Sequence, residues 1–259
     1  ASLQGTEKEE CKQNIEKGVK EYIRFMTEGI DKEKQDKILD IEMSANEHFF
    51  LWHTWFADVF EKGGFDIVIG NPPYIPLQNN NGKLAKLYRP CNFKTFAGRG
   101  DIYCLFYELG VITLSPKGVL CYITSDKWMC SSYGKKLKQF LIDHAFLEKL
   151  LDFAGVQIFE NATVETNIAL IRNFHSSDST ECALLTKKIK KEQFHSLHSY
   201  IKNHSVPMTF NNTDSWSILT EEEFSLQEKI NNSGPTLKEQ GISVNFGQKT
   251  GLNDAFIIS

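Results

Sequence analysis

A short apolar run that ends in two consecutive prolines constrains the fold more than any other feature of this chain. Residues 65–69, Phe-Asp-Ile-Val-Ile, follow the glycine pair 63–64 and predict a buried strand. Residues 71–74 then read Asn-Pro-Pro-Tyr. Each proline fixes its own φ, lacks an N–H donor and favours an extended conformation in the residue before it. The strand must therefore end in a stiff turn that presents two acceptors, the Asn71 side chain and the Pro72 carbonyl.

The rest of the chain alternates between helical and strand patterns, which predicts an α/β fold with parallel strands in its sheet. Apolar spacing predicts helices within residues 7–43 (two, meeting near Gly29), 101–114, 131–145 and 220–231. Further strands are predicted at residues 119–124, 147–153 and 166–172, and a strand, turn and strand at 242–259. The aromatic residues of 49–56 predict core packing, and residues 78–100 predict a long loop.

Charge and cysteine content limit the classes of partner. The net charge of −4 argues against a free-standing DNA-binding protein, although it allows a basic cleft on an acidic body. No two of the six cysteines have the C-x-x-C spacing, so we expect no metal site. The sequence shows no signal peptide and no apolar run of membrane-spanning length. We therefore expect a cytoplasmic protein with no membrane partner.

The Asn-Pro-Pro-Tyr turn suits one chemical task, which is to bind an exocyclic amine. The amino group of adenine is a weak nucleophile because its lone pair is delocalised into the ring. Two acceptors on its hydrogens favour a pyramidal nitrogen, and the Tyr74 ring can stack on a base flipped out of the duplex. A sulfonium methyl donor then needs only alignment, without a metal or a covalent enzyme intermediate. The alternative is a strand-ending turn that happens to contain two prolines.

Residues 63–75 closely resemble the catalytic motif of the large DNA adenine-N6 methyltransferases found in type IIG restriction–modification enzymes. Weaker matches to that family follow in the expected order, so that the resemblance covers roughly residues 49–259. These matches are Asp101–Phe106, Gly118–Trp128, Val156–Phe159 with Ala162–Asn167, and Thr250–Phe256. The last of them resembles the entry to a target-recognition domain.

The resemblance implies a Rossmann-like methyltransferase sheet and a role for particular residues. Asn71 and Pro72 would bind the amino group of a flipped adenine in double-stranded DNA, Tyr74 would stack on that base, and Pro73 would also bind the substrate. Phe159 would pack against the other side of the base. Phe106 would contact the adenine of the cofactor S-adenosylmethionine. For Phe106 and Phe159, an ordinary place in the core is an equally open interpretation.

One departure concerns the cofactor. The family binds S-adenosylmethionine mainly through a glycine-rich turn that follows a strand upstream of the catalytic motif. No glycine before Asn71 forms such a turn, Gly98-Arg99-Gly100 lacks a preceding strand, and Asp58 is a poor candidate for holding the ribose. We therefore expect a fragment that binds the cofactor weakly by itself and is inactive alone.

The expected domains are a helical segment at 1–48, a catalytic core at 49–210 that lacks the glycine-rich segment, and the start of a target-recognition domain at 211–259. Sequence specificity is expected to lie mainly beyond Ser259. Two alternatives remain open. The same four-residue motif occurs in methyltransferases that act on protein glutamine or on RNA guanine. The chain could also be an inactive DNA-binding fragment.

Overall fold

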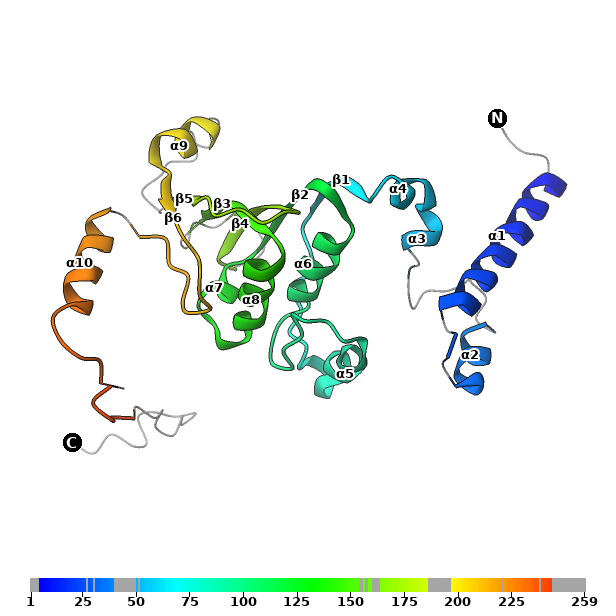
Figure 1. Ribbon diagram of the computed structural model, residues 1–259, viewed down its shortest axis with the longest axis horizontal. Helices are drawn as coiled ribbons and strands as arrows, with labels where there is room; N and C mark the ends of the chain where they lie inside the picture. Colours follow the sequence, from blue (N-terminus) through cyan, green and yellow to red (C-terminus); the bar gives the residue numbers. More distant parts are fainter. Residues whose placement is uncertain are drawn as a thin grey trace. The chain divides into compact units, whose positions relative to one another are not determined.

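The computed structural model of the chain is shown in Figure 1. It describes every residue except 1–4, 27, 30, 40–49, 51, 154–155, 157, 160–163, 186–196, 220, 238 and 244–259. The chain divides into two compact units, Ala1–Phe65 and Asp66–Ser259. The predicted strands at 242–259 lie almost wholly outside the described residues.

The first unit is helical over its described residues. Helix α1 spans Gly5–Met26 and α2 spans Lys32–Leu39, which confirms the two helices predicted within residues 7–43. Val19 and Ile23 lie one turn apart on α1 and are both buried. Gly29 lies between the two helices with φ at 92°, a conformation that favours glycine.

The prediction that the aromatic residues of 49–56 pack in a core is wrong for the described ones. They lie on α3 (Trp52–Trp55), just before it, and just before α4 (Ala57–Glu61), and Trp55 is 53% exposed. Their rings contact one another instead, as Phe50 and Trp55 do with centroids 6.1 Å apart. Helices of one turn each are too short to bury a continuous apolar face, so the rings shield only their neighbours.

A six-stranded sheet organises the second unit, and the predicted α/β class is confirmed. The strand order is β1-β2-β4-β3-β5-β6. The strands are β1 (Phe65–Gly70), β2 (Leu114–Ser125), β3 (Phe146–Asp152), β4 (Thr166–Arg172), β5 (Thr180–Leu184) and β6 (Val206–Met208). β3 and β4 follow the predicted ranges closely, whereas β2 begins well before Val119, and β5 and β6 were not predicted.

The strand directions are more antiparallel than the sequence predicts. β4 runs antiparallel to both β2 and β3, with Leu170 opposite Cys121 and Ala169 opposite Leu150. β6 is antiparallel to β5, and only β3 and β5 are parallel among the pairs whose direction is described. The reason lies in the connection, since parallel neighbours need a long crossover and no described helix separates β3 from β4.

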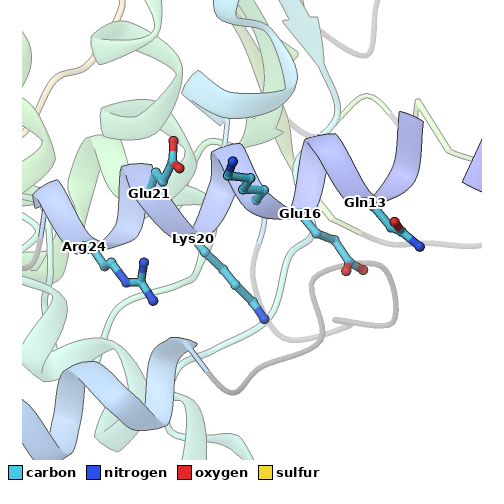
Figure 2. A pocket seen from close by; sticks show the side chains of 6 residues that line it. Gln13, Glu16, Lys20, Glu21 and Arg24 are labelled. Atoms are coloured by element: carbon cyan, nitrogen blue, oxygen red, sulfur yellow. The ribbon is translucent and has the colours of Figure 1, made fainter. Parts of the chain in front are cut away.

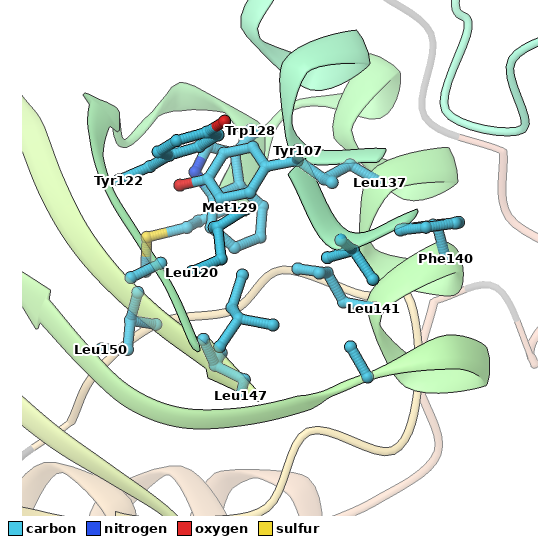
Figure 3. Packing of buried hydrophobic residues seen from close by; sticks show 14 of the residues in the cluster. Tyr107, Leu120, Tyr122, Trp128, Met129, Leu137, Phe140, Leu141, Leu147 and Leu150 are labelled. Carbon is cyan, nitrogen blue, oxygen red and sulfur yellow. The ribbon is translucent and has the colours of Figure 1, made fainter. Parts of the chain in front are cut away.

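Three helices cover one face of this sheet. They are α6 (Tyr103–Ile112), α7 (Lys127–Cys130) and α8 (Lys135–His144), the last preceded by the 3₁₀ turn η3 (Ser132–Gly134). Figure 3 shows their side chains Tyr107, Trp128 and Leu137 gathered with Leu120 and Leu150 of the strands. α6 lies directly on β2 at Gly110. A Cβ at this position would stand 2.1 Å from Leu120 Cδ1. Only glycine fits at that position without a shift.

β1 is a strand as predicted, but the prediction that it is buried is wrong. Ile67 is 69% exposed and Ile69 is 78% exposed, whereas Val68 packs against the core. β1 is the first strand in the order of the described sheet, with β2 as its neighbour. The apolar run therefore reflects one covered face, and its alternate residues are left open.

Residues 78–100 are not the long loop that the sequence predicts. They contain α5 (Asn79–Tyr88) and the 3₁₀ turn η2 (Arg89–Cys91). Asn80, Asn81 and Gly82 have left-handed φ values between 52° and 73°, so regular helix begins only after Gly82. The run of Asn and Gly hides the short apolar face that follows. That face packs in a second small core cluster that includes Leu77, Leu84, Ala85, Tyr88, Ile102 and Leu105.

The chain returns to the main core after β6. Trp216 is buried there, and its backbone N–H donates to the Met129 carbonyl at 3.0 Å. The Lys138 ammonium donates to the carbonyl oxygens of Met129 at 2.9 Å and Asp214 at 2.6 Å. The remaining helices are α9 (Leu197–His204) and α10 (Glu221–Asn231), and α10 confirms the helix predicted at residues 220–231.

Candidate active site

The Asn-Pro-Pro-Tyr turn leaves the end of β1 with alternating exposure. Asn71 and Pro73 are exposed, Pro72 is buried, and Tyr74 is half-buried. The strand end is tightly packed, because a Cβ at Gly70 would lie 3.2 Å from the Tyr122 ring. The turn therefore has one side fixed in the protein and another that offers the Asn71 side chain to solvent. The structure brings the four predicted residues 71–74 together in this arrangement.

Tyr74 is anchored by its hydroxyl rather than left free. The hydroxyl donates to the Ile123 carbonyl of β2 at 3.2 Å. Its ring meets Tyr103 of α6 edge-on, with centroids 6.0 Å apart. Burial, together with the nearby Asp101 carboxylate, raises the pKa of Tyr74 to about 12. The side chain is thus a neutral aromatic group with a fixed orientation at neutral pH.

The chain after the turn is pinned to the start of α6. Ile102 N–H donates to the Ile75 carbonyl at 3.0 Å, and Leu77 N–H donates to the Gly100 carbonyl at 2.9 Å. Between these bonds, Asp101 Oδ1 accepts the Ile75 N–H at 2.8 Å. Burial raises the pKa of Asp101, and the N–H groups that it accepts, that of Ile75 first, oppose the rise. Residues 100–102 therefore brace the outgoing end of the turn.

Sequence reasoning did not assign a role to Asp101. It stood only within a segment that resembled the family. The available signal was its position just before a helix, where Asp is a common capping residue. That signal indicates a bond to the helix, but not the bond to Ile75, which lies 26 positions away in the sequence.

The two remaining predicted aromatic residues lie elsewhere in the fold. Phe106 is half-buried on α6 and packs against both the main core and the cluster around Leu77. Tyr74 packs against the same main core. Phe159 is half-buried between β3 and β4, next to Ile158, which packs against a third cluster that includes Leu151. The roles of Phe106 toward a cofactor and of Phe159 toward a base remain predictions.

S-adenosylmethionine fits the described residues only in part. Phe106 offers an aromatic surface on α6, close in the chain to the brace at residues 100–102. Gly98 to Gly100 do not form a glycine-rich turn of the kind that binds nucleotides. The Gly100 carbonyl accepts the Leu77 N–H, and no described strand leads into these residues. Among the described turns, none is a glycine-rich turn that both follows a strand and opens a helix. The described residues therefore do not form a glycine-rich cofactor turn, and a contact of Phe106 with the cofactor remains a prediction.

A hollow along α1 in the first unit is lined by charged and polar side chains, shown in Figure 2. No predicted site residue lines it, and its mixed charges lie along one solvated helix face. Over the described residues, no group of three or more His, Cys, Asp or Glu side chains is placed to hold a metal ion. No described helix is both long and apolar enough to cross a membrane.

Comparison with known proteins identifies the family. The family described as Eco57I restriction-modification methylase matches residues 4–159, which is more than half of the chain. This chain belongs to the Eco57I restriction-modification methylase family. The methylase match includes the whole turn at residues 71–74, its brace at 100–102 and Phe106, and it ends at Phe159.

Relatives of this methylase chain include three named restriction–modification proteins. The type II methyltransferase M.BstVI of Geobacillus stearothermophilus is 26% identical over 226 residues, covering 81% of this chain and 40% of the relative. M.PaeR7I of Pseudomonas aeruginosa is also 26% identical, over 83% of this chain and 40% of the relative. The restriction enzyme and methyltransferase RM.Eco57I of Escherichia coli is 28% identical over 64% of this chain and 16% of its own length. The chain thus spans about 40% of the length of the first two relatives.

Proposed function

We propose that this protein is a DNA adenine-N6 methyltransferase of a restriction–modification system, and that residues 71–74 bind the target amino group. The observation that carries the proposal is the geometry of this turn. Asn71 is exposed at the end of β1 while Pro72 and Tyr74 are held in the protein. Membership of the methylase family, and the type II methyltransferase relatives, support the same reaction class.

The chemistry follows from the two acceptors. Asn71 Oδ1 and the Pro72 carbonyl oxygen would each accept one N–H of the adenine amino group. These bonds strengthen as the nitrogen becomes pyramidal, so they stabilise the transition state more than the bound substrate. The direction of the Pro72 carbonyl is restricted, because Pro73 follows it and Pro72 itself is buried.

Tyr74 would hold the flipped base beside these acceptors. Its hydroxyl bond to Ile123 and its T-shaped contact with Tyr103 hold the ring in a fixed orientation. Pro73 is exposed next to it, and Phe159 is the proposed partner on the opposite side of the base. S-adenosylmethionine, when bound, supplies an electrophilic methyl group on its sulfonium, and Phe106 is the residue proposed to lie against its adenine ring.

The test is methyl transfer by the full-length protein with Asn71→Ala. Unmodified genomic DNA serves as substrate because it contains all short recognition sequences, and the labelled base is identified after digestion. Loss of one preorganised acceptor costs about 3 kcal/mol, which is about a hundredfold in rate. Asn71→Asp keeps an acceptor of the same length and should retain more activity. Tyr74→Phe should be mild and Tyr74→Ala severe, because only the alanine removes the ring.

Asn232→Ala is a matched control, since it removes an exposed amide just after α10. Its transfer rate should equal that of the unchanged protein. A near-normal rate for Asn71→Ala would contradict the proposal. So would a product other than N6-methyladenine, or transfer to RNA or protein in place of DNA.

A further inference from the structure

The chain that leaves the catalytic turn is basic on an otherwise acidic protein. Residues 67–100 contain no Asp or Glu, although the net charge of the whole chain is −4. The basic side chains of this stretch are all exposed, and they are Lys83, Lys86, Arg89, Lys94 and Arg99. We call residues 83–99 the basic segment. A strongly positive stretch on an acidic body indicates a surface for a polyanion.

The fold turns the lysines of α5 outward. Leu84, Ala85 and Tyr88 form the inner side of this helix and pack in the cluster around Leu77. Lys83 and Lys86 are three positions apart and therefore lie on one side of the helix, roughly opposite that inner side. Both are exposed. Packing of the apolar side thus fixes the direction in which these two charges project.

Hydrogen bonds hold the basic segment at a fixed distance from the turn. Ala85 N–H donates to the Leu77 carbonyl at 3.0 Å, and Leu77 N–H donates to the Gly100 carbonyl at 2.9 Å. Both ends of the segment are therefore tied to Leu77, three residues after Tyr74. Within the segment, Arg89 also approaches the last residues, since a Cβ at Gly98 would lie 3.9 Å from Arg89 Nη2.

The positive charges of this segment are not neutralised by the acid that lies beneath it. Glu108 is buried, and its carboxylate accepts the backbone N–H groups of Lys94 at 3.1 Å and Thr95 at 2.8 Å. The Lys94 ammonium instead lies 2.7 Å from His144 Nε2. Over the described ranges of the chain, none of the five basic side chains forms an ion pair with a carboxylate. Their charge remains available to a partner.

We propose that the basic segment contacts the phosphate backbone of double-stranded DNA beside the target base. This inference rests on the proposed function, because it takes the duplex as the polyanion and Asn71 as the position of the flipped base. Lysines on a helix that is tied to the catalytic turn would fix the register of the duplex relative to Asn71. Such contacts supply affinity without sequence information. The contribution of the segment is therefore the same for every DNA sequence.

The experiment measures the salt dependence of binding to a random-sequence duplex by the full-length protein. The variant is K83Q/K86Q, and the matched control is K135Q/K136Q, which removes two exposed lysines from the start of α8. Each phosphate contact contributes about 0.9 to the slope of log K against log salt concentration. K83Q/K86Q should lower that slope by about 1.8, with equal loss of affinity on unrelated sequences. The control should retain the slope of the unchanged protein.

The outcomes separate this inference from the proposed function. An unchanged slope in K83Q/K86Q, or an equal decrease in K135Q/K136Q, would overturn the assignment of the surface while methyl transfer to DNA by the unchanged protein still stood. A selective loss of binding to single-stranded RNA, with duplex binding intact, would also overturn it. Failure of the unchanged protein to methylate unmodified genomic DNA would instead overturn the proposed function. Equal thermal unfolding of all three proteins would show that folding does not account for the difference.

Discussion

Two turns at the ends of neighbouring strands do opposite things in this molecule. The turn after β1 leaves Asn71 and Pro73 exposed and is held by the bond of its own Tyr74 to Ile123 and by Asp101. The turn after β2 enters α7 and buries Trp128 and Met129 completely. The first presents a polar side chain, and the second closes the core. After β1 two consecutive prolines keep the chain extended and leave Asn71 exposed, whereas after β2 the chain folds into helix and packs.

The largest effect should come from removing a buried side chain from α7, which follows β2; we call this region the packed turn. Trp128→Ala removes a fully buried ring that contacts Tyr107 and Trp216, and it should cost about 3–5 kcal/mol of unfolding free energy. Trp128→Phe should cost less, because it keeps a ring and removes the indole N–H, which has no hydrogen-bond partner in the described residues. Urea unfolding checks both. Asn71→Ala, in the turn after β1, should change the free energy of unfolding by less than about 0.5 kcal/mol.

A smaller loss of stability is expected from a change in residues 100–102, which brace the turn at residues 71–74. Asp101→Ala removes the acceptor for Ile75 N–H and should cost about 1.5 kcal/mol of stability. It should also lower the rate of methyl transfer more than it weakens DNA binding, because the turn that positions Asn71 is loosened. Asp101→Asn retains an oxygen at the same place and should recover most of the rate. Equal rate loss in both variants would contradict a positioning role.

The smallest effect concerns Asp126, the carboxylate at the packed turn. Burial, and then Asp152 and Glu165, raise the pKa of Asp126 from 3.8 to about 6. The folded state therefore binds this proton more tightly than the unfolded state, and stability falls as pH rises from about 4 to 6. Asp126→Asn should remove that penalty, which is about 1 kcal/mol at pH 8 once its partial exposure is considered. Unfolding at pH 4 and pH 8 checks this, and an equal gain at both would refute it.

The parts of the fold that depend on local pattern were predictable from sequence. The β4 strand and the helices α8 and α10 follow regular apolar spacing, and the turn after β1 follows from two prolines. The burial of β1 was less predictable. An apolar run such as the one that contains Ile67 and Ile69 reads the same in sequence whether or not another layer of the protein covers those side chains. Strand direction and the brace formed by Asp101 depend on residues far apart in the chain, which no local pattern encodes.

The candidate site was predictable to a similar degree. Residues 71–74 stand together because they are contiguous, whereas the burial of Tyr74 depends on its contacts with β2 and α6. The helix α5 was missed because three consecutive left-handed residues precede its apolar face. The basic segment that this helix carries was consequently interpreted as a loop, and its fixed outward direction became evident only from the packing of Leu84 and Ala85.

The hydrogen bonds of the Lys138 ammonium determine where the protein can be shortened without opening its core. It joins the carbonyls of Met129 and Asp214, which are far apart in the chain, and Trp216, whose ring stacks on Phe210, follows closely after Asp214. A fragment cut at residue 210 would leave a cation with one of its two carbonyl partners and open the side of Trp128 that Trp216 covers. A fragment that runs through Ile218, which is also buried, keeps this closure intact. A shortened version for expression or crystallisation should therefore end after Ile218.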